Sequence, residues 1–324
     1  MKKLSTLILS CLTLSLSAQQ FPDSRSCSIT DLMFSAQDMT LCPSNSGTDI
    51  SSVISDLGTI YYLRDDANDD TIAGPVVGDG NPIIFNTGSI ASTTTYNVIA
   101  AGTKTALEFD GIDDMVNCDT PPVITGDFTM ECWVNHTVNT LYPAYISTWT
   151  NAPLSGWWIG SNTFGQPEFW IGNAFIQSTQ IISDGNWHHV AAVYYMATGN
   201  SEIYIDGVLE VAGVLPFVAP TVNLTLGNDY TGEALEGKLD EVRIWNRALS
   251  ATEIANGLCN FDKSNADLIR YFDFEDGMNS STLSDLSANN VDGILELMDP
   301  ANDWVLGDAC GNCEMELSTL ITVT

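Results

Sequence analysis

Asp240 is the carboxylate in this chain whose position most clearly requires a binding partner. It lies in the phrase Leu239-Asp-Glu-Val-Arg-Ile-Trp245, where strand alternation puts it on the same face as Val242 and Ile244. Those apolar neighbours indicate the buried face, and a buried carboxylate must be hydrogen-bonded, paired with a cation or bound to a metal. Two interpretations therefore stand: Asp240 accepts backbone N–H groups at a bulge, or it is a metal ligand.

The histidines do not predict a catalytic group. His188 and His189 are neighbours in a predicted strand, so one is expected in the core and the other at the surface. His136 lies beside a strand end with nothing to mark it. No serine stands in a nucleophile-elbow phrase, so a Ser-His-Asp triad is not supported.

Aromatic residues gather in the middle of the chain, at Trp149, Trp157, Trp158, Phe169 and Trp170. Sugars stack their C–H faces on tryptophan, so an exposed pair would form a carbohydrate platform. Trp157 and Trp158 point to opposite faces of a strand, so at most one of them faces outward. The opposing interpretation places most of these aromatics in the core.

The strands that position these residues are short and lie between Ala106 and Leu249. Thr129–Val134 and Asn186–Tyr195 are expected as long central strands. Asp206-Gly207 predicts a two-residue hairpin turn, because both positions require positive φ. A capping box at Ser250-Ala-Thr-Glu253 predicts a short helix that ends near Leu258.

Four phrases of this region together resemble the LamG-like jelly-roll family, the concanavalin A-like lectin/glucanase fold. They are Leu107–Gly111, Asp184–Val190, Ile203–Gly207 and Gly237–Trp245. The resemblance implies an all-β sandwich over residues 105–258. It leaves the function open, because this fold hosts lectins, glycosidases and adhesion modules.

The resemblance also implies a structural Ca²⁺, held in many such sandwiches between the opening Phe-Asp-Gly region and an aspartate of the last strand. Carried onto this chain, the ligands would be Asp110, the carbonyl group of Gly111 and Asp240. In the opposing interpretation Asp110 only starts a turn. The strand signature of laminarinase-type glycosidases is absent, so no catalytic carboxylate pair is predicted.

Residues 19–104 are expected to form a separate β unit. Tyr61–Leu63, Pro82–Phe85 and Thr95–Ala100 are strand-like, and the last of them resembles the final strands of immunoglobulin-like modules. The acidic turn Asp65–Asp70 lacks the glycine and glutamate of an EF-hand, which favours a solvated hairpin tip.

The C-terminal segment, residues 259–324, carries a phrase typical of the start of a jelly roll. We expect Arg270–Phe274 to return to the sandwich as its missing opening strand, which would cover an open edge. A truncated second jelly roll is the alternative.

Residues 1–18 resemble a secretory leader, with two lysines, an apolar run and a small residue at Ala18; a lipoprotein acylated at Cys11 is the alternative. Export makes disulfides the default. The sequence does not fix their pairing, and the expected pairs are Cys27–Cys42, Cys118–Cys132 and Cys259–Cys310. The spacing of Cys310 and Cys313 is that of a zinc knuckle, but no second pair completes a site.

The charge narrows the possible partners. With 10 basic and 41 acidic residues the chain carries a net charge of −31, which argues against nucleic acid or an anionic membrane as a ligand. The acids either keep the exported protein in solution or hold Ca²⁺. The sequence therefore predicts a secreted or cell-surface, non-enzymatic, all-β protein that binds a glycan or protein ligand. A glycoside hydrolase or lyase of the same fold and an architectural module of an adhesin are the alternatives.

Overall fold

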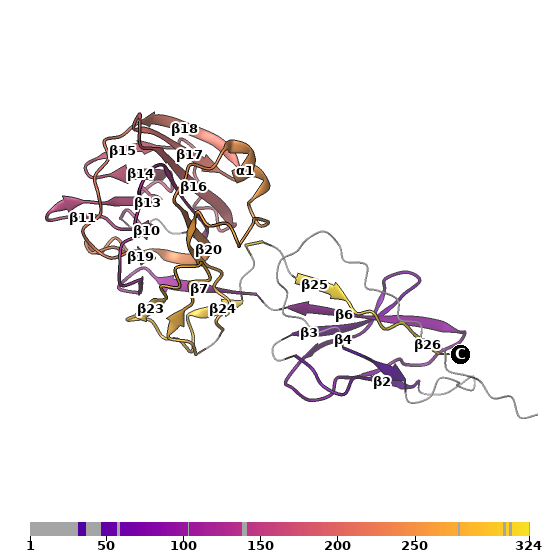
Figure 1. Cartoon of the computed structure of the whole chain (residues 1–324). Coiled ribbons are helices and arrows are strands. Elements are labelled where there is room, and N and C mark those ends of the chain that lie inside the picture. Colours follow the sequence, from indigo (N-terminus) through magenta and orange to yellow (C-terminus); the bar gives the residue numbers. More distant parts are fainter. Residues whose placement is uncertain are drawn as a thin grey trace, which may run out of the picture. The chain divides into compact units, whose positions relative to one another are not determined.

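The protein is described by a computed structural model, which covers residues 32–36, 47–56, 59–102, 104–137, 141–277, 279–306, 309–310 and 313–323. Two compact units divide the chain (Figure 1). The first comprises residues up to Gly102 together with Cys313–Thr324, and the second comprises Thr103–Asn312. The predicted leader, Cys27 and Cys42 lie outside the described residues. Within the described part of the chain, no helix is long and apolar enough to cross a membrane.

The first unit has two antiparallel sheets around one core. The smaller sheet runs in the order β1 (Ser35–Ala36), β2 (Asp49–Ser51) and β5 (Ile84–Asn86). The larger sheet contains β3 (Ile60–Asp65), β4 (Thr71–Val77), β6 (Thr94–Gly102), β25 (Cys313–Glu316) and β26 (Ile321–Val323). Ile50 and Phe85 of the small sheet pack with Tyr61 and Val98 of the large one. An immunoglobulin-like topology for this unit stays a prediction.

The second unit is a sandwich of two eight-stranded sheets, which confirms the all-β expectation. One layer, the β8 sheet, runs β15 (Ala174–Gln177), β14 (Pro167–Ile171), β13 (Trp157–Ser161), β10 (Ala144–Ser147), β19 (Thr225–Leu226), β8 (Met115–Asn117), β23 (Gly293–Glu296), β22 (Thr282–Leu283). The other, the β9 sheet, runs β18 (Val208–Val214), β17 (Asn200–Ile205), β16 (His188–Tyr195), β9 (Phe128–Asn135), β20 (Glu236–Trp245), β7 (Thr105–Asp110), β24 (Trp304–Leu306), and its eighth strand, β21 (Leu268–Phe272), pairs with β20. A small hairpin of β11 (Thr150–Asn151) and β12 (Leu154–Ser155) stands beside the β8 sheet.

Side chains that alternate in direction along the strands fill the space between these sheets. Trp157 and Phe169 reach inward from the β8 sheet, and Phe128 and Val190 reach inward from the β9 sheet. The predicted central strands are β9 and β16, which pair along their whole length. The hairpin after β17 turns at Asp206 and Gly207, whose φ angles are 51° and 81°, so the predicted two-residue turn is confirmed.

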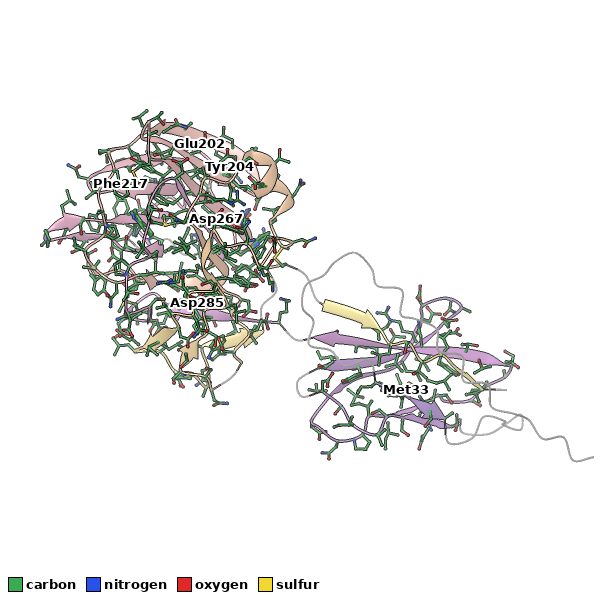
Figure 2. All side chains as sticks on the ribbon, in the orientation of Figure 1. Met33, Glu202, Tyr204, Phe217, Asp267 and Asp285 are labelled. Carbon is green, nitrogen blue, oxygen red and sulfur yellow. A yellow bond between two sulfur atoms is a disulfide. The ribbon has the colours of Figure 1, made fainter. Side chains whose placement is uncertain are left out.

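Residues 259–312 contribute strands to both layers. The strand expected at Arg270–Phe274 is β21 (Leu268–Phe272), which runs antiparallel to the second half of β20. Asp285 holds the chain beside it, because its buried carboxylate accepts backbone N–H groups from Tyr271, Ser287 and Val291. Asp285 is labelled in Figure 2. The last strands, β25 and β26, pair with β6 of the first unit instead.

The predicted capping box opens the helix α1 (Ala251–Asn256). The Ser250 hydroxyl accepts a hydrogen bond from the Glu253 backbone N–H, and the Glu253 carboxylate accepts one from the Ser250 backbone N–H. These bonds satisfy two of the unpaired N–H groups of the first turn. The helix ends at Gly257, slightly earlier than the sequence pattern indicates.

One predicted disulfide is confirmed and one is wrong. Cys259 and Cys310 are bonded, with their Cα atoms 5.5 Å apart. Cys118 and Cys132 are free, buried thiols in the core of the sandwich. Cys118 follows β8 in one sheet and Cys132 lies in β9 of the other. Packed sheets stand roughly 10 Å apart, farther than a disulfide allows between Cα atoms.

Candidate binding site

Three tryptophans lie on the outer side of the β8 sheet or beside it. Trp158 and Trp170 are directly opposite each other on β13 and β14. Their strand neighbours Trp157 and Phe169 are in the core, so Trp158 and Trp170 face away from it. Trp170 in turn stacks on Phe175 of β15, with ring centroids 4.3 Å apart. The row of rings therefore crosses three adjacent strands.

Together with two loop residues these rings enclose a cavity of about 200 Å³, called here the aromatic pocket. Its lining residues are Tyr142, Trp149, Trp158, Trp170 and Glu233. Trp149 follows β10 and is fixed by a hydrogen bond of 2.5 Å from its indole N–H to the carbonyl group of Gly172. The pocket is thus built from segments that lie far apart in the sequence.

Gly160 makes room for the Trp158 ring. A Cβ atom at position 160 would lie 2.4 Å from the ring of Trp158 and 2.2 Å from the carbonyl oxygen of Pro143. Because both contacts are shorter than van der Waals distance, a side chain at 160 would push the ring out of place. The absence of a side chain at Gly160 therefore sets the depth of the pocket on this side.

Carboxyl groups gather at one side of the pocket. Burial, together with the nearby charges of Asp229 and Glu168, raises the pKa of Glu233 to about 8. Burial also raises the pKa of Glu168, whose carboxylate accepts a 2.7 Å hydrogen bond from the Trp170 indole N–H. Asp229 is 4% exposed and binds the backbone N–H of Glu233 through Oδ1. The pocket is therefore lined by apolar ring surface and acidic groups.

Two polar atoms at this site have no hydrogen-bond partner among the described residues. They are the indole N–H of Trp158 and Oδ2 of Asp229, both on side chains that are more than nine-tenths buried. Unsatisfied buried groups cost roughly 1–3 kcal/mol each. Both atoms are themselves buried, so they belong to the wall of the site and not to its accessible surface.

The sequence identified the aromatic cluster but not which of its residues face the core and which line the pocket. Trp157 and Phe169 are core residues, whereas Trp149, Trp158 and Trp170 line the pocket. This agrees with the expectation that at most one of Trp157 and Trp158 faces outward. Sequence reasoning missed Tyr142 and Glu233. No local pattern marks them, because only the tertiary fold brings these two residues to β13 and β14.

The predicted metal ligands do not come together. Asp110 pairs with Glu236 across β7 and β20, so Asp240 lies four residues further along the strand. At about 3.3 Å per residue this separates the two aspartates by roughly 13 Å, whereas Ca²⁺ binds oxygens at about 2.3–2.6 Å. The combination of Asp110, Gly111 and Asp240 as ligands of one ion is therefore wrong.

Asp240 instead lies at a bulge in β20. The register with β9 shifts between Asp240 and Arg243, and Glu241 has a φ of 50°. Oδ1 of Asp240 accepts the Glu241 backbone N–H at 2.7 Å, as the hydrogen-bonded interpretation expects. Burial, with the charges of Glu241 and Glu275 beside it, holds the pKa of Asp240 well above its usual value.

Asp110 has other acidic neighbours. Its carboxylate, with those of Asp113 and Asp114, provides oxygens within 4.8 Å of one another. Burial raises the pKa of Asp114 to about 6, and the charges of Asp110 and Asp303 add to the shift. Among the described residues, this is the one group of three whose spacing fits a metal ion.

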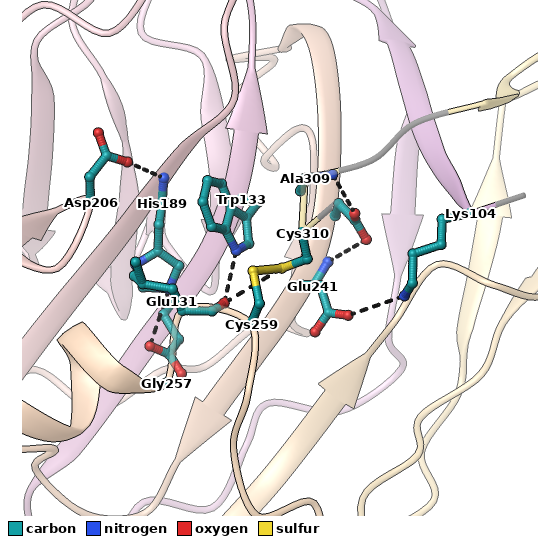
Figure 3. The surroundings of a disulfide bond; sticks show 12 residues. Lys104, Glu131, Trp133, His189, Asp206, Glu241, Gly257, Cys259, Ala309 and Cys310 are labelled. Atoms are coloured by element: carbon teal, nitrogen blue, oxygen red, sulfur yellow. Dashed lines mark hydrogen bonds and ion pairs between the residues drawn. A yellow bond between two sulfur atoms is a disulfide. The ribbon is translucent and has the colours of Figure 1, made fainter. Parts of the chain in front are cut away.

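A second polar cluster lies buried beside the loop that follows α1. The Arg243 guanidinium is 3.2 Å from one carboxylate oxygen of Glu131. Nε2 of His189 is 3.3 Å from the other, and Figure 3 draws this contact near the Cys259–Cys310 disulfide. The Trp245 indole N–H also donates to Glu131, and Arg243 donates to the carbonyl groups of Gly257 and Leu258. His189 is the core histidine of the expected pair, while His188 is partly exposed beside Asp184 and Asp206.

Burial and the neighbouring charges shift the pKa values in this cluster. Burial would raise the pKa of Glu131, but Arg243 and the bond to His189 lower it to about 2. Burial lowers the pKa of His189. These groups are enclosed by α1 and the following loop, so the arrangement is structural.

Comparison with known sequences identifies the domain. The model of the concanavalin A-like lectin/glucanases superfamily, Laminin_G_3, matches residues 110–255. This part of the chain is therefore a concanavalin A-like domain, as the resemblance of the four phrases implied. No curated protein matches the chain in sequence.

Solved structures show distant likenesses. A proposed carbohydrate binding protein from Bacteroides ovatus is 13% identical, with 90% of this chain and 99% of that chain covered and a TM-score of 0.48. A heptameric SAP-like pentraxin from Limulus polyphemus is 11% identical, covers 68% of this chain and 95% of its own, and has a TM-score of 0.40. Domains LG4-5 of the mouse laminin alpha1 chain are 15% identical, with 45% and 43% covered and a TM-score of 0.36.

Proposed function

We propose that the concanavalin A-like domain of residues 110–255 binds glycans in the aromatic pocket and releases them unchanged. The observation that carries this proposal is the enclosure of one cavity by Trp149, Trp158 and Trp170 with the carboxyl group of Glu233. Indole rings offer flat apolar surface to the C–H faces of a sugar ring. The carboxyl group of Glu233 offers hydrogen bonds to its hydroxyl groups.

A glycan array tests this proposal, when it is combined with product analysis by mass spectrometry. We expect the full chain to retain a defined set of glycans and to leave their chain lengths unchanged after long incubation. If the protein binds no glycan of the array although circular dichroism shows it to be folded, glycan binding would be contradicted. That result would favour an architectural module of a surface adhesin.

Glycoside hydrolysis in the same pocket is the second candidate function. Glu233 lines the pocket with the charge of Glu168 close to it, and the raised pKa of Glu233 suits a general acid. Shortened products in the incubation, lost in the variant Glu233→Gln, would favour the hydrolase. Binding is preferred because Glu168 is buried and occupied by the Trp170 indole N–H, so it is not free to reach a substrate.

Export to the outside of the cell belongs to the same proposal. The Cys259–Cys310 bond supports it, because disulfides persist in oxidising compartments. Fractionation of cells that produce the full chain tests it, since the protein should leave the cytoplasm with residues 1–18 removed. A cytoplasmic protein with an intact N-terminus would contradict export.

Calcium binding stays a prediction, and the spacing of the Asp110, Asp113 and Asp114 carboxylates supports a proposal that these three residues hold the ion. A ligand that binds only the folded state stabilises it by about 2.7 kcal/mol at a hundredfold excess over Kd. EDTA should therefore lower the melting temperature of the full chain, and Asp114→Asn should abolish that response. Asp240→Asn is the control that keeps the response. Identical melting with EDTA and with added calcium would contradict the site.

A further inference from the structure

The aromatic pocket is lined by one acidic side chain, Glu233, with Asp229 and Glu168 near it and no basic side chain among the described residues. None of the described lysine, arginine or histidine side chains lines it. Three indole rings and the Tyr142 ring form most of its wall, and Glu233 supplies the charged side chain. A neutral sugar requires only stacking and hydrogen bonds. A pocket with negative charge and no positive charge therefore favours a ligand that carries a positive charge.

Indole faces attract cations. The quadrupole of an aromatic ring presents negative charge at its face, and tryptophan binds ammonium groups most strongly of the aromatic residues. Several rings around one small cavity, with a carboxylate beside them, form the arrangement that recognises alkylated or primary ammonium groups. The pocket of Trp149, Trp158 and Trp170 has this composition.

One carboxylate oxygen of Asp229, near Glu233, gives a second indication. Oδ2 of Asp229 is buried and accepts no hydrogen bond from the described residues. Asp229 and Glu168 are both close enough to act electrostatically on Glu233. A bound cation would stabilise this group of carboxylates, which otherwise repel one another.

The spacing of these acids does not fit a bare metal ion. Oxygen ligands of Ca²⁺ must lie within a few ångströms of a common centre. Among the described residues, only Asp110, Asp113 and Asp114 bring three ligand atoms within 4.8 Å of one another. The more widely spaced acids of the aromatic pocket fit an organic cation, whose charge is spread over a larger volume.

We infer that the aromatic pocket binds a glycan that carries a free amino group, with its ammonium group between the indole rings and Glu233. This inference rests on the proposed glycan binding and specifies its ligand class. An amino sugar supplies both the ammonium group and a C–H face that stacks on an indole ring.

Binding of a cation should couple to the ionisation of Glu233. The groups that act on Glu233 are Asp229 and Glu168, and Tyr142 lines the same cavity. With a pKa near 8, about a tenth of Glu233 is ionised at pH 7 and about nine-tenths at pH 9. A permanently charged probe such as choline should therefore bind up to about tenfold more tightly at pH 9 than at pH 7. Its neutral isostere, 3,3-dimethyl-1-butanol, should show no such rise.

Calorimetry on the full chain at pH 7 and 150 mM salt tests the inference. The ligands are a β-1,4-linked glucosamine trimer, its N-acetylated counterpart and trilysine, which matches the charge without the sugar. We expect the glucosamine trimer to bind at least about tenfold more tightly than either of the others. Glu233→Gln should remove that preference and leave the weaker binding of the acetylated trimer unchanged. Glu236→Gln, an exposed acid outside the pocket, should keep it.

Several other outcomes of these measurements would overturn the inference, and one would overturn the proposed function as well. Equal or tighter binding of the acetylated trimer, or equal binding of trilysine, would overturn the inference and leave glycan binding intact. A preference that disappears with EDTA would overturn it in favour of a metal-mediated contact. If no glycan binds at all, the proposed function falls as well. Should Glu233→Gln fail to fold by circular dichroism, the pH dependence of choline binding to the unmodified chain decides the matter.

Discussion

Replacing Glu131 with alanine is expected to lower the free energy of unfolding by about 3–5 kcal/mol, because it leaves the buried charge of Arg243 without its counter-ion. Arg243 is fully buried, and its ion pair with Glu131 is 3.2 Å long. The same substitution removes the acceptor of the Trp245 indole N–H and the partner of His189. Denaturant unfolding of the full chain, followed by tryptophan fluorescence, measures the loss.

The matched control is Glu108→Ala, which removes one partner of an exposed pair. Glu108 lies 3.8 Å from Lys238 and has a half-exposed side chain. Exposed pairs contribute about 0.2–1 kcal/mol, so this variant should unfold almost like the unmodified protein. Similar losses for Glu108→Ala and Glu131→Ala would show that burial of the Arg243 cluster is not what stabilises the sandwich.

Loss of the Cys259–Cys310 disulfide is expected to be similarly large. The bond closes a loop with a sequence separation of 51 residues, which in the chain-entropy model corresponds to about 4 kcal/mol. It ties the segment that follows α1 to the end of the second unit, so β21 to β24 lie within the closed loop. Comparison of melting temperatures between the unmodified chain and the double variant Cys259→Ser, Cys310→Ser measures the effect.

Reductant provides the internal control for that experiment. The unmodified chain should lose stability when it is reduced, and the double variant should respond much less. The free thiols of Cys118 and Cys132 should contribute no response to reductant. If the double variant has the same melting temperature as the unmodified chain, the loop is held by its strand pairing alone.

Local features of the fold were predictable because their causes lie within a few residues. The Asp206-Gly207 turn follows from the need for positive φ at both positions, and the capping box of α1 follows from two side chains three residues apart. The return of the segment at Arg270 to the sandwich as a strand was also expected, since its phrase is typical of an opening strand, and the structure shows that it pairs with β20. These features depend on residue type more than on tertiary context.

Features that depend on register between distant strands were not predictable. Asp110 and Asp240 each had the expected residue type, but the pairing of Asp110 with Glu236 separates them along the sheet. Cys118 and Cys132 are near in sequence and lie in opposite sheets. The first outcome depends on the pairing register and the second on which sheet each strand joins, and composition carries no information about either.

The aromatic pocket was predictable only in part. The alternation of Trp157 and Trp158 required that they point to opposite faces, and the structure shows which of them reaches the core. Glu233 enters from the loop between β19 and β20, more than seventy residues after Trp158 in the sequence. Sequence reasoning could find the rings because they are adjacent, and it missed the acid because only the fold brings it there.

The indole N–H signals in a two-dimensional ¹⁵N–¹H NMR spectrum of the full chain test the central claim most directly. On addition of the strongest glycan from the array, the signals of Trp158, Trp149 and Trp170 should shift together, because all three residues line the pocket. Trp245, whose N–H donates to Glu131 in the core, should stay unchanged. A glycan that binds while the three pocket signals keep their positions would contradict the assignment of the aromatic pocket as the binding site.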